Sequence, residues 1–199
     1  AVESRRPGGQ DYDGDILLDA AGNATVLESM GGANIDLGLA TSSFIRSATD
    51  GEESLTLRTS GSTDINARIG NNGQRLASFT TDGGGTTYLD NLEVNTTGDQ
   101  TYKDVVVIKR DMQLRGDTVR FHNTTDANAP GSKGITVTGN LEIGDSGSDQ
   151  VGANEPLEFI TVSGTTVFDT DATVATSGDQ NYTGTVTLNH GPTLTADDV

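Results

Sequence analysis

Residues 96–108 read TTGDQTYKDVVVI, and residues 176–188 read TSGDQNYTGTVTL. The glycine, aspartate, glutamine and tyrosine recur at a constant offset, with Gly98 and Tyr102 in the first segment and Gly178 and Tyr182 in the second. After each tyrosine comes a short run in which apolar residues occupy every second position. That period is typical of a strand with one buried face. The two segments therefore indicate a repeated unit in which a turn leads into a short strand.

The same pattern of short strands extends along the chain. Val119 and Phe121 flank one polar residue, and so do Ile135-Thr-Val137 and Leu141-Glu-Ile143, while glycine, asparagine and aspartate lie between such runs. Strands this short bury little individually and become stable when coils stack on one another. The sequence predicts an all-β fold, a parallel β-helix with about 20–25 residues per coil and three or four coils per repeat.

A tandem array of Ig-like β-sandwiches is the alternative fold, because such domains have about 100 residues. Two features favour the solenoid. The successive copies differ in internal length, which a solenoid accommodates as loops, and the chain holds a non-integer number of copies.

The predicted domain organisation is simple. Residues 1–15 are expected to form an acidic, flexible lead-in, and residues 16–199 a single solenoid. Its repeats are expected at about 16–93, 94–173 and 174–199, the last one partial. The sequence ends within a repeat, which suggests an excised segment or a subunit whose open end is covered.

Four residues of the repeated phrase are expected to be structural turn markers. Gly98 and Gly178 are predicted to supply a corner with positive φ, a conformation that suits glycine. Asp99 and Asp179 are predicted to bond the turn backbone through their side chains.

The composition limits the partners and the location. The 199 residues include 29 acidic and 12 basic ones, for a formal net charge of −17. Such a surface repels nucleic acids and anionic membranes, so neither is expected as a partner. No stretch approaches the ~20 apolar residues of a membrane span, so membrane insertion is not expected. The chain has no cysteine, so its stability must come from packing and backbone pairing.

The phrase T-T/S-G-D-Q-x-Y-x-x-x-V-x-L, followed by V-x-F and L-x-V/I, resembles the repeats of large bacterial surface exoproteins of the filamentous-haemagglutinin-like adhesin type. This resemblance implies a secreted or cell-surface protein with a right-handed β-helix. It also implies a role as a stalk, an adhesin or a component of a biofilm matrix, with host or surface glycans or proteins as partners.

The tripeptide Arg115-Gly116-Asp117 is one candidate site. In an adhesin-like chain, an exposed arginine and aspartate on either side of a glycine turn suggest a receptor-binding loop. The alternative is structural, because Asp117 aligns with Asp197 and so belongs to the repeat's own turn.

Three alternate acidic residues form a second candidate site. Asp11, Asp13 and Asp15 have the spacing of calcium ligands. An EF-hand is excluded, because Ile16 and Gly22 stand where its glycine and glutamate are needed. Calcium is the one metal that the sequence suggests, and no cofactor is expected to be required.

Enzymatic activity is not expected. A polysaccharide-cleaving β-helix needs paired carboxylates on neighbouring coils. Aspartates are plentiful in the turns, but no arginine, lysine or histidine cluster accompanies them in the sequence, and His122 and His190 are isolated. The predicted function is therefore a non-enzymatic, extracellular structural or adhesive role. A subunit of a filament that assembles end to end with copies of itself is the alternative.

Overall fold

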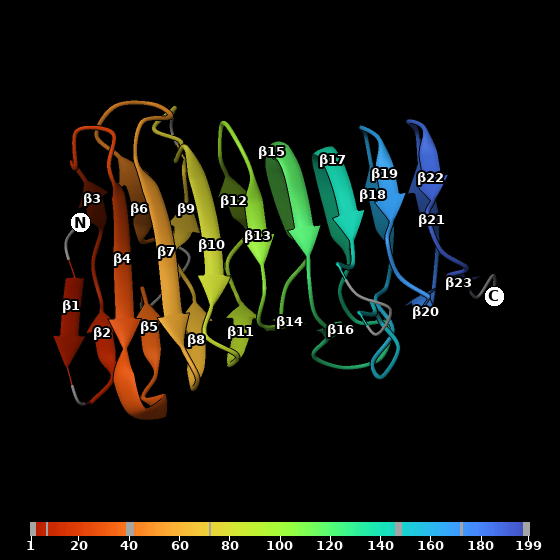
Figure 1. Cartoon of the computed structure of the whole chain (residues 1–199), viewed down its shortest axis with the longest axis horizontal. Coiled ribbons are helices and arrows are strands. Elements are labelled where there is room, and N and C mark those ends of the chain that lie inside the picture. The colour runs from red at the N-terminus through yellow and green to blue at the C-terminus, as the bar shows by residue number, and fades with distance from the viewer. Residues whose placement is uncertain are drawn as a thin grey trace.

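The computed structural model describes residues 3–6, 8–38, 42–71, 73–145, 149–171 and 173–196, with side chains from residue 8 onward. Strands predominate and wind into a solenoid of about eight turns. Figure 1 shows the strands side by side along the long axis, with β1 at one end of the rod and β23 at the other. Among the described residues, no helix has the length and apolar character needed to cross a lipid bilayer.

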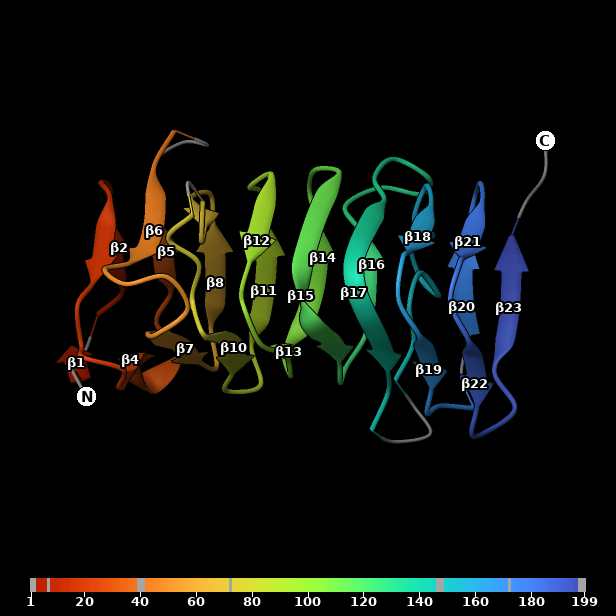
Figure 2. The same ribbon diagram turned by 90° about the horizontal axis from the view of Figure 1, so that it is seen from above.

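Each turn contributes one strand to each of three faces, which Figure 2 shows from above. Two long strands, β15 (Met112–Phe121) and β17 (Ile135–Ile143), cross from the third face to the first. Besides the second halves of these, the first face contains β1 (Glu3–Arg6), β4 (Ala24–Ser29), β7 (Ser54–Thr59), β10 (Ser78–Asp82), β13 (Gln100–Tyr102), β19 (Thr166–Phe168) and β22 (Val186–Leu188). The second face contains β2 (Gln10–Tyr12), β5 (Ile35–Leu37), β8 (Ser62–Ile65), β11 (Thr86–Leu89), β14 (Val105–Ile108), β16 (Thr125–Ala127), the single bridge residue Val151, β20 (Thr173–Thr176) and β23 (Thr193–Ala196). Besides the first halves of β15 and β17, the third face contains β3 (Ile16–Leu18), β6 (Phe44–Ser47), β9 (Arg68–Ile69), β12 (Glu93–Asn95), β18 (Ile160–Val162) and β21 (Gln180–Tyr182).

The strand pairing confirms the predicted fold class. Strands of successive turns pair in parallel, as in the register of β10 on β7 and of β13 on β10. A tandem array of Ig-like sandwiches is therefore wrong, because that fold is built from antiparallel sheets. The one helical element among the described residues is the short 3₁₀ turn η1 (Met30–Gly32).

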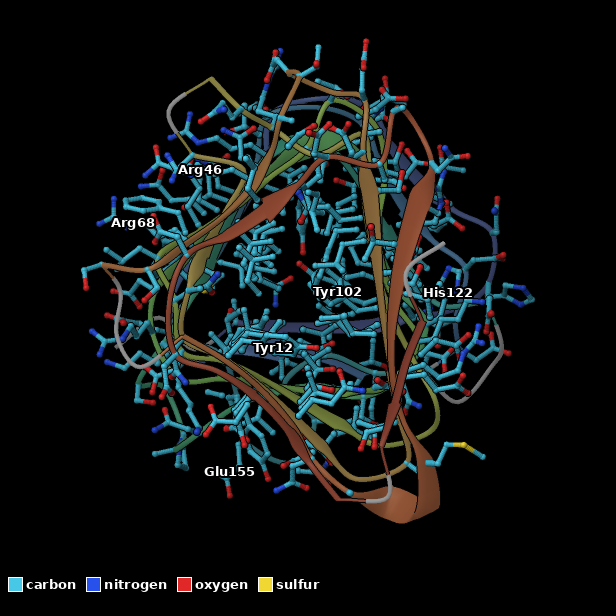
Figure 3. All side chains as sticks on the ribbon, turned by 90° about the vertical axis from the view of Figure 1, so that its left-hand side faces the viewer. Tyr12, Arg46, Arg68, Tyr102, His122 and Glu155 are labelled. Carbon is cyan, nitrogen blue, oxygen red and sulfur yellow. The ribbon has the colours of Figure 1, made fainter. Side chains whose placement is uncertain are left out.

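The core is a column of side chains that point inward from alternate strand positions. In β7, Leu55 and Leu57 are buried while Thr56 between them faces outward. Tyr102 lies between Phe79 and Phe121 of the neighbouring turns, with ring centroids 5.9 and 5.2 Å apart. Figure 3 shows Tyr102 inside the three-sided outline, with Arg46 and Arg68 on the outside. Each buried aliphatic or aromatic side chain contributes about 1.5–3 kcal/mol, so the stack, rather than a single centre, supplies the stability.

The solenoid begins earlier than the sequence predicts. β2 lies inside the expected lead-in 1–15 and pairs with β5. Residues 8–18, GGQDYDGDILL, are a first copy of the repeated phrase, with Gln10 and Tyr12 in the places of the later glutamines and tyrosines. Counted from the first glycine of each copy, the units begin at residues 8, 98 and 178. The first copy was missed because its Gly-Gly differs from the Gly-Asp of the other two.

The repeat does not contain a whole number of turns. The first unit holds eleven strands, β2 to β12. The second also has eleven strand positions from β13 to β20, because β15 and β17 each occupy two faces and Val151 fills one position. Eleven strands at three per turn make three and two-thirds turns. The second unit has 80 residues from Gly98 up to Gly178, so one turn has about 22 residues, within the usual range for a solenoid. Each copy of the phrase therefore lies on a different face: β2 on the second, β13 on the first and β21 on the third.

Candidate functional site

The glutamine and tyrosine of the repeated segment form a hydrogen-bonded pair inside the coil. The side chain of Gln100 is fully buried, and its Nε2 donates to the carbonyl oxygens of Val94 at 3.0 Å and Arg115 at 2.8 Å. The hydroxyl of Tyr102 donates to Gln100 Oε1 at 3.1 Å. Burial raises the pKa of Tyr102 far above its ordinary value, so this hydroxyl stays protonated. Because Val94 and Arg115 belong to successive turns, the glutamine joins one coil to the next.

The other two copies make the same kind of contact. Gln180 Nε2 donates to the carbonyls of Val174 and Thr195 at 3.2 and 2.8 Å, and the Tyr182 hydroxyl donates to Gln180 at 3.1 Å. In the first copy, the Tyr12 hydroxyl donates to Gln10 at 2.9 Å. The glutamine–tyrosine pair of the repeated segment therefore has a structural role, and it occurs once on each face.

The turn markers act differently from the prediction. Gly98 and Gly178 do not have positive φ. They are glycines because the chain of the preceding turn passes close by: an added Cβ would lie 2.8 Å from the carbonyl oxygen of Ala77 or of Glu158, respectively. The carboxylate of Asp99 is paired with Arg120 on the next turn, and no hydrogen bond joins it to the turn backbone of the described residues.

The corner between the third and first faces holds a ladder of such glycines. In four successive turns, an added Cβ would lie only 2.0–2.7 Å from the carbonyl oxygen of the glycine below. These four glycines, which we call the glycine ladder, are Gly116, Gly139, Gly164 and Gly184. The backbone pairing at this corner therefore requires a residue without a side chain.

A groove follows the same corner, and it contains the predicted Arg-Gly-Asp site. Its volume is about 430 Å³, and we call it the corner groove. The register places one residue from each of four successive turns in a single row. The row consists of Arg75, Asn95, Arg115 and Thr138, and the rest of the lining is Thr96, Thr97, Gly116 and Asp117.

The Arg-Gly-Asp tripeptide does not form a protruding loop. It lies within β15, where the register shifts between Arg115 and Thr118. Arg115 Nε is paired with Glu93 at 3.0 Å, and Gly116 is a member of the glycine ladder. Asp117 donates its backbone N–H to Gly98 and has an exposed side chain. Its alignment partner Asp197 lies outside the described residues. The arginine and the glycine therefore both have structural roles.

Charges on the two groove arginines are balanced by carboxylates outside it. Arg75 forms a two-pronged contact with Asp50, with the closest atoms 2.6 Å apart. This contact lowers the pKa of Asp50 through the hydrogen bond from Arg75. Arg115 is paired with Glu93 through a single contact of 3.0 Å. The lining is therefore rich in hydrogen-bonding groups while its net charge is small.

The three predicted calcium ligands have different partners in the structure. Asp15 accepts the backbone N–H of Phe44 at 2.9 Å and is paired with Arg46 at 2.9 Å. Asp13 lies beside Asp11, whose negative charge raises the pKa of Asp13. Among the residues with described placement, no group of three or more histidine, aspartate or glutamate side chains is arranged to hold a metal ion.

Asp11 belongs instead to a row of carboxylates that the sequence analysis missed. On the second face, Asp11 is in register with Asp36, and Asp36 with Asp64. Desolvation, followed by the charges of Asp64 and Asp11, raises the pKa of Asp36. Asp64 is balanced by Lys109 at 3.3 Å, and the Lys109 ammonium lies 4.5 Å from the centre of the Tyr88 ring. The signal was the recurrence of aspartate at the outward position of QDY, IDL and STDI.

Several turn aspartates have a basic neighbour in space that is not near them in the sequence. His122 Nδ1 lies 3.2 Å from Asp145, and His190 Nε2 lies 3.2 Å from Asp169. Arg120 joins Asp99 to Glu142 across three turns. Sequence reasoning missed these pairs because their members lie a full turn apart along the chain and meet only through coil stacking.

Comparison with protein-family models, with curated proteins and with solved structures finds no match. The resemblance to filamentous-haemagglutinin-like repeats therefore remains a prediction from the sequence.

Proposed function

We propose that the chain is a non-enzymatic segment of a bacterial surface adhesin, working outside the cell as a stiff spacer with adhesive faces. The observation that carries this proposal is the continuous stack of about eight turns, each joined to the next by parallel backbone pairing. A rod of this kind holds its length because bending it requires strand pairs to separate on at least one of three faces.

Side chains that join successive turns add to this stiffness. Gln100 links two turns from inside, and Arg120 links Asp99 and Glu142 on the outside. Exposed ion pairs contribute little singly, but a network that repeats along the axis limits sliding between coils. The acidic surface keeps such rods apart in solution.

The spacer role is tested by single-molecule stretching of the purified chain. If the coils are the mechanical units, the chain lengthens in steps of one turn, about 22 residues or roughly 75 Å of extended chain. A single all-or-none extension would contradict the role of separate coils.

The adhesive and extracellular roles need their own experiments. Beads coated with the purified chain should be retained on cell layers or glycan-coated surfaces more than beads coated with an equally acidic control protein. An antibody against the chain should label intact producing cells. Equal retention of both kinds of bead would refute adhesion, and labelling only after lysis would refute the surface location.

A head-to-tail filament is the second candidate function, and exposed apolar residues at both ends of the stack favour it. Val186, Leu188 and Leu194 in β22 and β23 are 41, 56 and 42% exposed. At the other end, Tyr12 and Leu17 line an apolar pocket of about 350 Å³. A second copy translated along the axis would place its first three strands over the last three, face on face, which is a heterologous contact that extends into fibres.

Light scattering and electron microscopy test the filament. Leu188→Glu should abolish any self-association of the purified chain, because it places a charge in the contact. Leu92→Glu is the matched control, since Leu92 is 37% exposed at mid-rod. A chain that stays monomeric at high concentration would refute the filament.

A further inference from the structure

We propose that the corner groove binds a linear, uncharged oligosaccharide whose chain lies along the solenoid axis. This inference rests on the adhesive part of the proposed function and gives it a site and a ligand class. It also gives a role to the side chains around Arg115-Gly116-Asp117 that neither the core nor the glycine ladder explains.

The first support is the geometry of the row. Arg75, Asn95, Arg115 and Thr138 present one outward side chain from each of four successive turns. Turns are separated by the strand spacing of about 4.7–4.9 Å, so the row spans roughly 14 Å. One sugar unit of an extended chain is about as long as one turn is high. A linear glycan along the corner therefore meets a new side chain with each unit.

The second support is the chemistry of the lining. A sugar hydroxyl both donates and accepts, and neighbouring hydroxyls on one ring can bond the two oxygens of a carboxylate or the two ends of an amide. Asp117 offers an exposed carboxylate, and none of the described residues forms a hydrogen bond or ion pair with its side chain. Thr138 offers an exposed hydroxyl, and Asn95 an amide. The groove thus combines donors and acceptors along one line that runs parallel to the solenoid axis.

The charges favour an uncharged ligand over a uronic acid chain. Asp50 and Glu93 already balance the two arginines. Asp117 would repel a carboxylate brought into the groove, and so would the net charge of −17. A neutral glycan avoids both costs and can still accept hydrogen bonds from the guanidinium N–H groups.

Calorimetric titration of the purified chain tests this inference. The probes are linear gluco-, galacto- and manno-oligosaccharides of two to six units, with uronic acid oligosaccharides of equal length as comparators. At least one neutral series should bind, with an affinity that rises up to about four units and then levels off, because the row has four positions.

Two conservative variants locate the site. Asp117→Asn and Thr138→Val should each weaken binding by about tenfold or more. Asp179→Asn and Thr161→Val are the matched controls, because these residues are also outward-facing but do not line the groove, and they should change the affinity by less than about twofold. Circular dichroism melts show whether each variant is folded.

Several outcomes would overturn the inference. They are no binding of any neutral probe at millimolar concentration, stronger binding of the uronic acid series, or equal effects of groove and control variants. Binding of an integrin-type receptor ectodomain that depends on Asp117, without glycan binding, would assign the corner to protein recognition instead. If coated beads adhere but no oligosaccharide binds, this inference fails and the adhesive function stands. If the beads do not adhere, the adhesive function itself fails.

Discussion

Replacing Gln100 by leucine tests how much the buried hydrogen bonds of this glutamine stabilise the solenoid. Leucine has a similar volume but removes both donors and the acceptor, so the bonds from Nε2 to the carbonyls of Val94 and Arg115 are lost. Each such bond contributes about 1 kcal/mol net. The hydroxyl of Tyr102 also loses its acceptor in a fully buried site, which costs about 1–3 kcal/mol. The free energy of unfolding should therefore fall by about 3–5 kcal/mol.

The chain contains its own control. Gln180 makes the equivalent bonds to Val174 and Thr195, but it lies in the last described turn, where solvent reaches it. Water can replace the lost partners there, so Gln180→Leu should cost about 1 kcal/mol or less. The difference between the two variants separates burial from the bonds themselves.

A second substitution sharpens the test. In Gln100→Leu/Tyr102→Phe both partners become apolar and no hydroxyl is left without an acceptor, so the double variant should regain about 1–2 kcal/mol over Gln100→Leu alone. Urea unfolding followed by far-ultraviolet circular dichroism measures the change, and hydrogen exchange read by mass spectrometry locates it at β13. Equal losses at Gln100 and Gln180, or a double variant less stable than the single one, would refute the reasoning.

Three further predictions concern the outer faces and the corners. Asp36→Asn should raise stability at neutral pH by about 0.5–1 kcal/mol, because it removes like charges in register. Since the folded pKa of Asp36 is raised, the gain should be full above that pKa and vanish below its ordinary value of 3.8, as urea midpoints across pH would show. Gly164→Ala should cost about 1–3 kcal/mol or more, since its Cβ would lie 2.4 Å from the carbonyl oxygen of Gly139. Gly14→Ala is the control, because a Cβ at this position has no atom within 4 Å, and it should not destabilise the chain. Equal stability of the Gly164→Ala and Gly14→Ala variants would contradict the stacking argument. Phe121→Ala should cost about 3–5 kcal/mol through the lost contact with Tyr102, a loss visible as a lower melting temperature.

The fold class followed from the sequence because period two and tight turns are local properties. The alternation around Val106 and Ile108 is visible without knowing what covers it, and a strand with one apolar face must stack. The length of a turn was also within the expected range. The face that each copy occupies could not be predicted. It depends on the unit containing three and two-thirds turns, and the number of strands per unit is known only from the structure.

The role of individual residues was harder to predict than the fold. The sequence around Gly98 predicts positive φ because turns commonly need it, whereas the close approach of Ala77 is a contact with another turn. The same limit applies to His122 and Asp145, and to the carboxylates of Asp11 and Asp36. The members of each pair lie a full turn apart along the chain, and only the register of the coils brings them together.

The mismatch between the repeat and the turn has a consequence for how a long array meets its surroundings. Each unit rotates its outward features by one face relative to the unit before, so three units display any feature encoded in the repeat on all three sides. A rod built in this way needs no preferred orientation about its axis to make contact. If the proposed adhesive role holds, such a rod would engage a flat surface on any side, with weak sites that add up through multivalency.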